Sequence, residues 1–187
     1  GAGGIVALKT VASAKPDGYT LSMIGGGLAL TKALFKALPY DLEKDFTPIS
    51  TTAFYGLIVA TRSGSSLNSV ADIIAAAKAK PGTLSYGTIN VGSLQHMSAE
   101  LFRILADIDV TMVPYKTTPD LLTGLLRGDI DVAFEYDPGL RSALNNGKAV
   151  AIAYTGRERP SQDARIPTVQ ESGIANYDVT SWDGLER

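Results

Sequence analysis

The stretch that most constrains the fold is residues 84–108, LSYGTINVGSLQHMSAELFRILADI, in which a strand pattern, a polar loop and a helical pattern follow one another. Apolar residues in its second half recur at intervals of three and four, which predicts an amphipathic helix with one apolar face. The face comprises Leu94, Met97, Leu101, Ile104, Leu105 and Ile108. A strand that leads through a glycine-containing loop into a helix is typical of α/β folds.

The loop of this stretch carries no charge and is rich in glycine, hydroxyl and amide groups. Such a loop can bring backbone N–H groups and hydroxyls close to a ligand, and the positive end of the following helix dipole points at the same place. The pattern therefore predicts a site for an anion such as a carboxylate or phosphate. Its candidate ligand-binding residues are Gly87, Thr88, Asn90, Gly92 and Ser93. An ordinary turn, with Ser93 or a neighbour as the N-cap of the helix, is the alternative.

Strand and helix patterns alternate along the rest of the chain. Strands are expected at residues 19–24 (buried), 46–61 (one or two), 110–113, 130–135, 150–154 and 177–182, and helices at 5–12, 28–35, 69–79, 119–127, 138–145 and 168–172. Ser69 is expected to be an N-cap and Gly128 a C-cap. The alternation implies a parallel or mixed sheet with helices on both faces. Ligands on such sheets bind beyond the carboxyl ends of strands, where loops 25–27, 87–93 and 135–138 would converge.

Composition excludes several classes of function. The 187 residues carry a net charge of −2 without a basic excess, which argues against nucleic acid as a partner. Cysteine is absent, so disulfides, thiolate catalysis and cysteine-ligated metals are excluded, and the single His96 excludes sites that need two imidazoles. No apolar run reaches the length of a membrane span. We expect neither a metal nor a cofactor.

Three further candidates lie at strand or helix ends. His96 follows Ser93 by three residues, but the sequence offers no acid to orient a nucleophile–base pair, so a histidine at a helix start is favoured. Glu135 lies at a strand end, either at a solvated edge or beside the ligand. Beside the ligand it would repel carboxylates and favour a cationic or hydroxyl group on the substrate. Gly26 belongs to a glycine run that either approaches a ligand or forms a tight turn.

Several motifs occur in a fixed order over nearly the whole chain. They are Gly1-Ala2-Gly3-Gly4, Pro16-Asp17-Gly18-Tyr19-Thr20-Leu21, Leu38-Pro39-Tyr40-Asp41, Lys44-Asp45-Phe46-Thr47-Pro48, Tyr86-Gly87 through His96, Val113-Pro114-Tyr115-Lys116, Pro167-Thr168-Val169 and Ser181-Trp182-x-Gly184-Leu185. This set resembles the solute-binding proteins of tripartite tricarboxylate transporters, the Bug family. Thr117, where the family usually has glycine, and Glu135, where it often has aspartate, depart from the pattern.

The resemblance implies an α/β, periplasmic-binding-protein-like fold of type II, in which two lobes close on a ligand like a Venus flytrap. Lobe I would comprise residues 1–59 and 154–187, and lobe II residues 60–153. Family members carry further residues before and after the matched motifs, so we expect a chain truncated at both ends with an incomplete first lobe.

The resemblance also implies a function. The expected protein is periplasmic and not an enzyme, and it captures a small organic carboxylate (a di- or tricarboxylate, amino acid or aromatic acid) for the membrane components of the transporter. Its ligand-binding set would include Gly26, His96 and Glu135 beside the loop residues. The truncated chain could also self-associate through an open sheet edge. The rival functions are a flytrap-type effector-sensing domain of a regulator and a hydrolase that uses Ser93 and His96.

Overall fold

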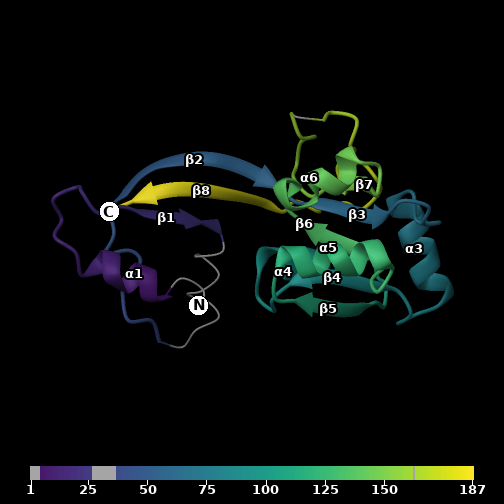
Figure 1. The fold of residues 1–187 in the computed structure, drawn as a ribbon, viewed down its shortest axis with the longest axis horizontal. Helices are drawn as coiled ribbons and strands as arrows, with labels where there is room; N and C mark the ends of the chain where they lie inside the picture. Colours follow the sequence, from purple (N-terminus) through teal and green to yellow (C-terminus); the bar gives the residue numbers. More distant parts are fainter. Residues whose placement is uncertain (1–4, 27–36, 162) are drawn as a thin grey trace. The chain divides into compact units, whose positions relative to one another are not determined.

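The computed structural model describes residues 5–26, 37–161 and 163–187 (Figure 1). The helices are α1 (Ile5–Ala12), α3 (Val70–Ala79), α4 (Leu94–Leu105), α5 (Thr118–Arg127) and α6 (Asp137–Asn145). The strands are β1 (Ser22–Gly25), β2 (Pro48–Gly56), β3 (Ile58–Arg62), β4 (Ser85–Ile89), β5 (Thr111–Tyr115), β6 (Val132–Glu135), β7 (Ala149–Tyr154) and β8 (Thr180–Glu186). The helix expected at residues 28–35 lies outside the described residues.

The chain forms two compact units. The first comprises Gly1–Phe54 with Ser181–Arg187, and the second comprises Tyr55–Thr180. The chain passes between them within β2 and again within β8. The lobe boundaries expected from the resemblance, at residues 59/60 and 153/154, stay a prediction.

A five-stranded mixed sheet, in the order β5-β4-β6-β3-β7, forms the centre of the second unit. Strand β4 runs parallel to both β5 and β6, whereas β3 runs antiparallel to β6 and β7. Because β4 and β6 are parallel neighbours, their carboxyl ends lie at the same edge, and α4 and α6 begin just beyond them. Strands β5 and β7 are the outer strands of this sheet. Pairing of copies through an open sheet edge of the incomplete first lobe stays a prediction.

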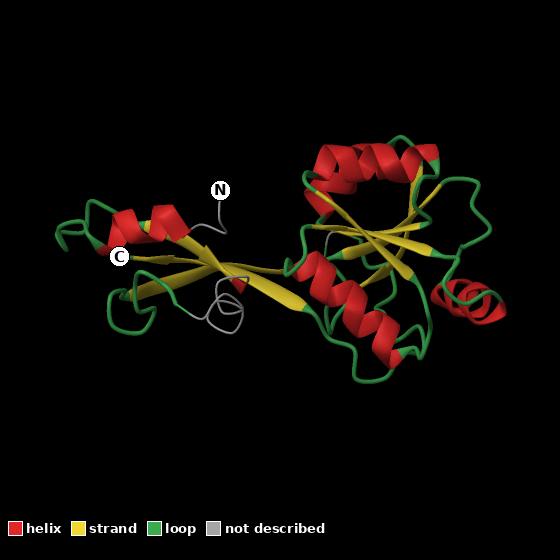
Figure 2. Cartoon of the chain, turned by 90° about the horizontal axis from the view of Figure 1, so that it is seen from below, coloured by secondary structure: helices red, strands yellow, loops and turns green. Residues whose placement is uncertain are grey.

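Helices cover both faces of this sheet, as the alternation of patterns predicts (Figure 2). Side chains along a strand point alternately to the two faces. Val59 packs with α3 and α4, whereas its neighbours Ile58 and Ala60 pack with α5 and α6. The first face contains an aromatic cluster of Tyr86, Phe102, Phe134 and Tyr177, whose ring centroids lie 5.5–6.0 Å apart.

Helix termini of the second unit follow their predicted chemistry. Ser69 caps α3 by accepting a hydrogen bond from the Asp72 N–H at 3.1 Å. Gly128 ends α5 in the left-handed conformation, with φ of +81°, which glycine adopts without steric cost.

The predicted apolar face of α4 is buried only in part: Leu101 packs against the core, and Ile108, just beyond the helix, is buried. The helix buries Gln95, Ser98, Ala99 and Phe102, while Met97, Ile104 and Leu105 are 43%, 61% and 40% exposed. The polar members of the buried face have partners inside the unit. The Ser98 hydroxyl lies 2.6 Å from the Tyr177 hydroxyl, and burial raises the pKa of Tyr177.

Two other expectations are wrong. Residues 168–172 form turns and not a helix, because Thr168 is held in a parallel bridge to Tyr154 and Gly173 turns the chain at φ of +108°. Residues 19–24 are not a buried strand: β1 begins at Ser22, and Met23 within it is 69% exposed.

The first unit is a three-stranded sheet in the order β1-β8-β2 with a small core of Leu8, Tyr40 and Phe46. Gly25 of β1 faces Asp183 of β8, and a Cβ at Gly25 would lie 2.8 Å from the Asp183 carboxylate. Arg187, the last residue, exchanges two backbone hydrogen bonds with Thr47.

Replacement of Phe102 by alanine should lower the free energy of unfolding by about 3–5 kcal/mol, because its fully buried ring would leave a cavity in the aromatic cluster. Met97→Ala on the same helix should change it by less than about 0.5 kcal/mol, because Met97 is exposed. Urea unfolding of both variants measures the difference. Equal losses would show that the apolar face of α4 is buried after all.

Glu186 should make the stability of the first unit depend on pH. Its side chain is 3% exposed, its Oε1 has no hydrogen-bond partner among the described residues, and burial raises its pKa. The folded state therefore keeps this proton at higher pH than the unfolded chain does, so stability falls as pH rises through the raised pKa.

Glu186→Gln should therefore raise the free energy of unfolding at pH 7 by about 1 kcal/mol and leave it nearly unchanged at pH 3. Urea unfolding at both pH values measures the effect, with the exposed Glu158→Gln as the control. A variant that is less stable than the parent at pH 7 would contradict the assignment.

Candidate functional site

The turn between β4 and α4 is built by its own polar groups. The Ser93 hydroxyl accepts a hydrogen bond from the His96 backbone N–H at 3.1 Å, which caps α4, and donates to the Ile89 carbonyl. The Asn90 N–H is held by the Tyr115 carbonyl at 3.0 Å. Gly92 has φ of +86°, a conformation that favours glycine. Ser93 is the N-cap of α4, as the alternative of an ordinary turn predicts, and Asn90 is exposed.

The start of α4 differs from the other helix starts of the second unit. The first turns of α3, α5 and α6 contain Asp72, Asp120 and Asp137, whereas the first turn of α4 contains no acidic residue. The first N–H groups of a helix have no partner within it and carry the positive end of the dipole. Among α3, α4, α5 and α6, α4 is therefore the helix whose first turn has no carboxylate to balance the positive end of its dipole.

His96 is oriented by a buried hydroxyl. The Thr88 Oγ1, fully buried at the end of β4, lies 3.2 Å from the His96 Nδ1. Either atom can donate, depending on the tautomer. The contact uses Nδ1, so Nε2 of the half-buried ring is the nitrogen that could meet a ligand.

The same contacts argue against a hydrolase. The Ser93 hydroxyl donates to the Ile89 carbonyl, and the His96 ring bonds Thr88. A nucleophilic serine instead needs its hydroxyl bonded to the base. Among the described residues no such serine–imidazole bond is recorded for this pair.

Gly87 serves packing. A Cβ at this position would lie 2.1 Å from Cδ1 of Ile130, so a side chain there would displace the core beneath α5. Gly26 lies in the other unit, where a Cβ would meet the Ser181 hydroxyl at 3.3 Å and the Trp182 ring at 3.7 Å. Ligand contacts of both glycines stay a prediction.

Glu135 ends β6 and is 1% exposed. Its Oε1 accepts hydrogen bonds from the Gln95 side-chain amide at 3.0 Å and from the Tyr136 N–H at 2.7 Å. Its Oε2 accepts from the Thr118 hydroxyl at 2.8 Å. All three partners donate, as an ionised carboxylate requires. The donors belong to the first turn of α4, the first residue of α5 and the N-cap of α6.

The structure thus brings the β4–α4 turn and Glu135 together through Gln95. Sequence reasoning missed both Gln95 and Thr118. A polar residue on the buried side of an amphipathic helix was the available signal for Gln95, but the apolar periodicity assigned the wrong side. Thr118 is the second residue after the Val-Pro-Tyr-Lys motif. The residues around it give no indication of its hydrogen bond to Glu135.

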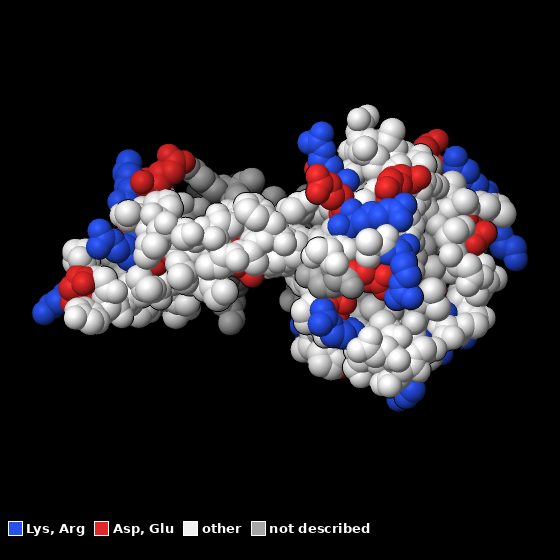
Figure 3. Space-filling model, turned by 90° about the horizontal axis from the view of Figure 1, so that it is seen from above, with Lys and Arg blue, Asp and Glu red and all other residues white. Residues whose placement is uncertain are grey.

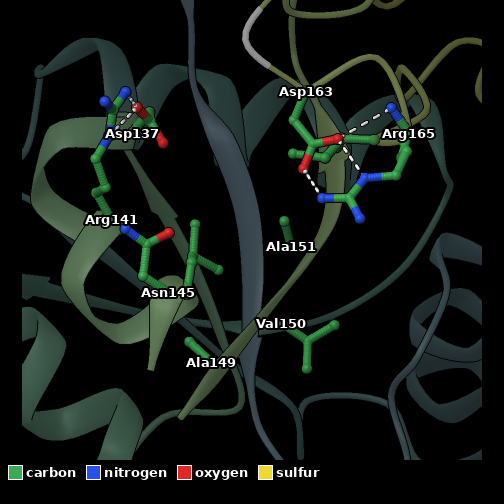
Figure 4. A pocket seen from close by; sticks show the side chains of 10 residues that line it. Asp137, Arg141, Asn145, Ala149, Val150, Ala151, Asp163 and Arg165 are labelled. Atoms are coloured by element: carbon green, nitrogen blue, oxygen red, sulfur yellow. Dashed lines mark hydrogen bonds and ion pairs between the residues drawn. The ribbon is translucent and has the colours of Figure 1, made fainter. Parts of the chain in front are cut away.

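A cavity of about 560 Å³ lies elsewhere in the second unit, between α6, the edge strand β7 and residues 163–166 (Figure 4). Two ion pairs face one another across it, Arg141 with Asp137 and Arg165 with Asp163. Hydrogen bonds from Arg165 hold the pKa of Asp163 below its usual value. Both guanidinium groups already have carboxylate partners, so this cavity is a poor site for an anion. Of the predicted site residues that the structure describes, none lines it.

The charge distribution, the metal-ligating side chains and the helix lengths of the described residues indicate no second site. Basic and acidic side chains are interspersed on the face shown in Figure 3. The described residues contain no group of three or more histidine, cysteine, aspartate or glutamate side chains that could hold a metal ion. Within the same part of the chain, every helix is too short or too polar to cross a membrane.

Comparisons with known proteins agree with this fold. The sequence profile described as "Tripartite tricarboxylate transporter family receptor" matches residues 1–186. Protein BugT of Bordetella pertussis is 29% identical over 184 residues, which cover 97% of this chain and 56% of that protein.

Two solved structures are also similar. The R. palustris protein Rpa4515 with adipate superposes with a TM-score of 0.87 at 30% identity, covering 98% of this chain and 62% of that one. MatC from Rhodopseudomonas palustris with bound malate gives 0.80 at 29% identity, covering 100% and 64%. The predicted α/β, periplasmic-binding-protein-like fold is confirmed. The chain spans a little over half the length of the curated relatives that it matches.

Proposed function

Because this chain belongs to the tripartite tricarboxylate transporter family of receptors, we propose that it contributes to a solute-binding protein that captures a small organic carboxylate. The relatives with adipate and malate support a carboxylate as the ligand class. We further propose a periplasmic location and delivery of the ligand to the membrane components of a tripartite transporter. Receptors of this kind bind and release their ligand unchanged, so no catalytic residue is proposed.

The observation that carries the proposal is the start of α4. It combines a Ser93 cap, an exposed turn and a first turn without an acid. We place the carboxylate of the ligand at this helix start, within reach of backbone N–H groups, the Asn90 amide and the His96 Nε2. Hydrogen bonds from neutral donors to a charged acceptor contribute roughly 1.5–3 kcal/mol each. Recognition by neutral donors would leave the ligand carboxylate without a buried counter-ion and allow its release.

The remaining predicted residues have indirect roles in this proposal. Thr88 orients His96, Gly92 permits the turn, and Gly87 allows the core to pack beneath it.

Replacement of Ser93 by aspartate tests the site, with Ser93→Asn as the matched control. Asparagine and aspartate both cap helices well, so both variants should fold. They differ in one negative charge and in the donation to the Ile89 carbonyl, which only the asparagine amide can keep, and thermal unfolding measures the cost of that lost bond. The aspartate would occupy the helix start and repel a ligand carboxylate. We expect Ser93→Asp to weaken binding about 100-fold more than Ser93→Asn does.

The measurement is isothermal titration of the chain and both variants with a panel of carboxylates that includes malate and adipate, together with thermal unfolding. Equal affinities of the two variants for a ligand that the parent chain binds would place the carboxylate elsewhere. Absence of binding to every member of the panel by the parent chain would count against the function itself.

A further inference from the structure

The carboxylate of Glu135 occupies a position that resembles an anion-binding site. It lies at the starts of three helices and accepts bonds from Gln95, Thr118 and the Tyr136 N–H. Helix starts attract anions, and here the attracted anion is a side chain of the protein. The carboxylate is 1% exposed, so water screens its charge little.

Glu135 is linked to the proposed ligand site by one residue. Gln95, which donates to Glu135, is the second residue of α4, and its neighbour His96 is held by Thr88. Gln95 is itself 8% exposed. A ligand bound at the start of α4 would therefore be separated from the Glu135 carboxylate by one buried side chain, that of Gln95.

We propose that Glu135 is a positioning and specificity-determining residue, a built-in carboxylate that makes the site favour ligands with one carboxylate and a neutral or cationic far end over dicarboxylates. The inference rests on the proposed function, because it concerns the ligand of that same site. In this proposal the first carboxylate of a ligand meets the start of α4, whose first turn contains no acidic residue. A second carboxylate has no comparable gain, because the Thr118 hydroxyl at the start of α5 and the Tyr136 N–H at the start of α6 already donate to Glu135.

Glu135→Gln separates charge from geometry. A glutamine can keep the bonds from Gln95 and Tyr136 to its oxygen, and its amide can donate to the Thr118 oxygen, because a hydroxyl both donates and accepts. Glu135→Asp does the opposite, since it keeps the charge and shortens the side chain that reaches Gln95 and Thr118. Asp120→Asn is the control, because it removes an exposed, solvent-screened acid from the start of α5.

The ligands are hexanoate, adipate and 6-aminohexanoate, which share six carbons and one carboxylate and differ at the far end. Isothermal titration should show that the chain binds 6-aminohexanoate and hexanoate more tightly than adipate. In Glu135→Gln, the ratio of adipate affinity to 6-aminohexanoate affinity should rise about tenfold. Glu135→Asp should keep the parent ratio while its melting temperature falls, and Asp120→Asn should keep both.

An unchanged ratio in Glu135→Gln, with the ligands still bound, would overturn the role of Glu135 and leave the proposed function standing. So would an equal rise in Asp120→Asn, which would show a general effect of charge. If the parent chain and Glu135→Gln bind none of these ligands nor malate, the proposed function fails, and the inference fails with it. Melting curves of each variant establish that a lost interaction does not reflect loss of the fold.

Discussion

The hydrogen bonds to the buried carboxylate of Glu135 couple the positions of three helices to one strand end. A carboxylate removed from water is strongly unfavourable unless donors surround it. Here the donors come from α4, α5 and the N-cap of α6, so none of these helix starts can shift without exposing an unmet charge.

The packing around this carboxylate is correspondingly close. A Cβ at Gly139 would lie 2.6 Å from the Thr118 methyl group and 3.0 Å from the Glu135 Cγ. The arrangement depends on β4 and β6 being parallel neighbours, because only then do their following loops meet at one edge. The same hydrogen bonds explain why the turn after β4 can lack charged residues and still keep one conformation. Glu135 fixes the helix that follows the turn, α4, through its bond from Gln95.

Much of this architecture could be predicted from sequence, and the failures have a common cause. Local chemistry predicted the caps at Ser69, Ser93 and Gly128, because each depends on the residue's own backbone. The buried face of α4 depended instead on distant partners. Gln95 is buried because Glu135 meets it and Ser98 because Tyr177 does, across 40 and 79 residues. Hydrophobic periodicity takes account of apolar side chains alone, so it predicted that Met97 and Ile104 belong to the buried face of α4.

The tail illustrates the same limit at short range. Thr168 accepts a hydrogen bond from the Glu171 N–H and Glu171 accepts one from the Thr168 N–H, which is the reciprocal pattern that opens many helices. The helix does not follow, because Tyr154 pairs with Thr168 and Gly173 reverses the chain. The sequence signal that starts a helix is local. Whether the helix continues depends on tertiary contacts, here the pairing of Thr168 with Tyr154.

Burial, more than the number of charges, decides which acids can influence a bound ligand. Asp163 and Asp137 are paired with Arg165 and Arg141 at a surface cavity, where water and the partner cancel most of their field. Glu135 has neutral donors and no cation among its recorded partners within the described chain, so its negative charge is solvated without being neutralised. A receptor that recognises a carboxylate with neutral groups is sensitive to such a charge, because the described residues of the proposed site include no arginine that would offset it. The selectivity of the proposed site would then follow from one side chain that never touches the ligand.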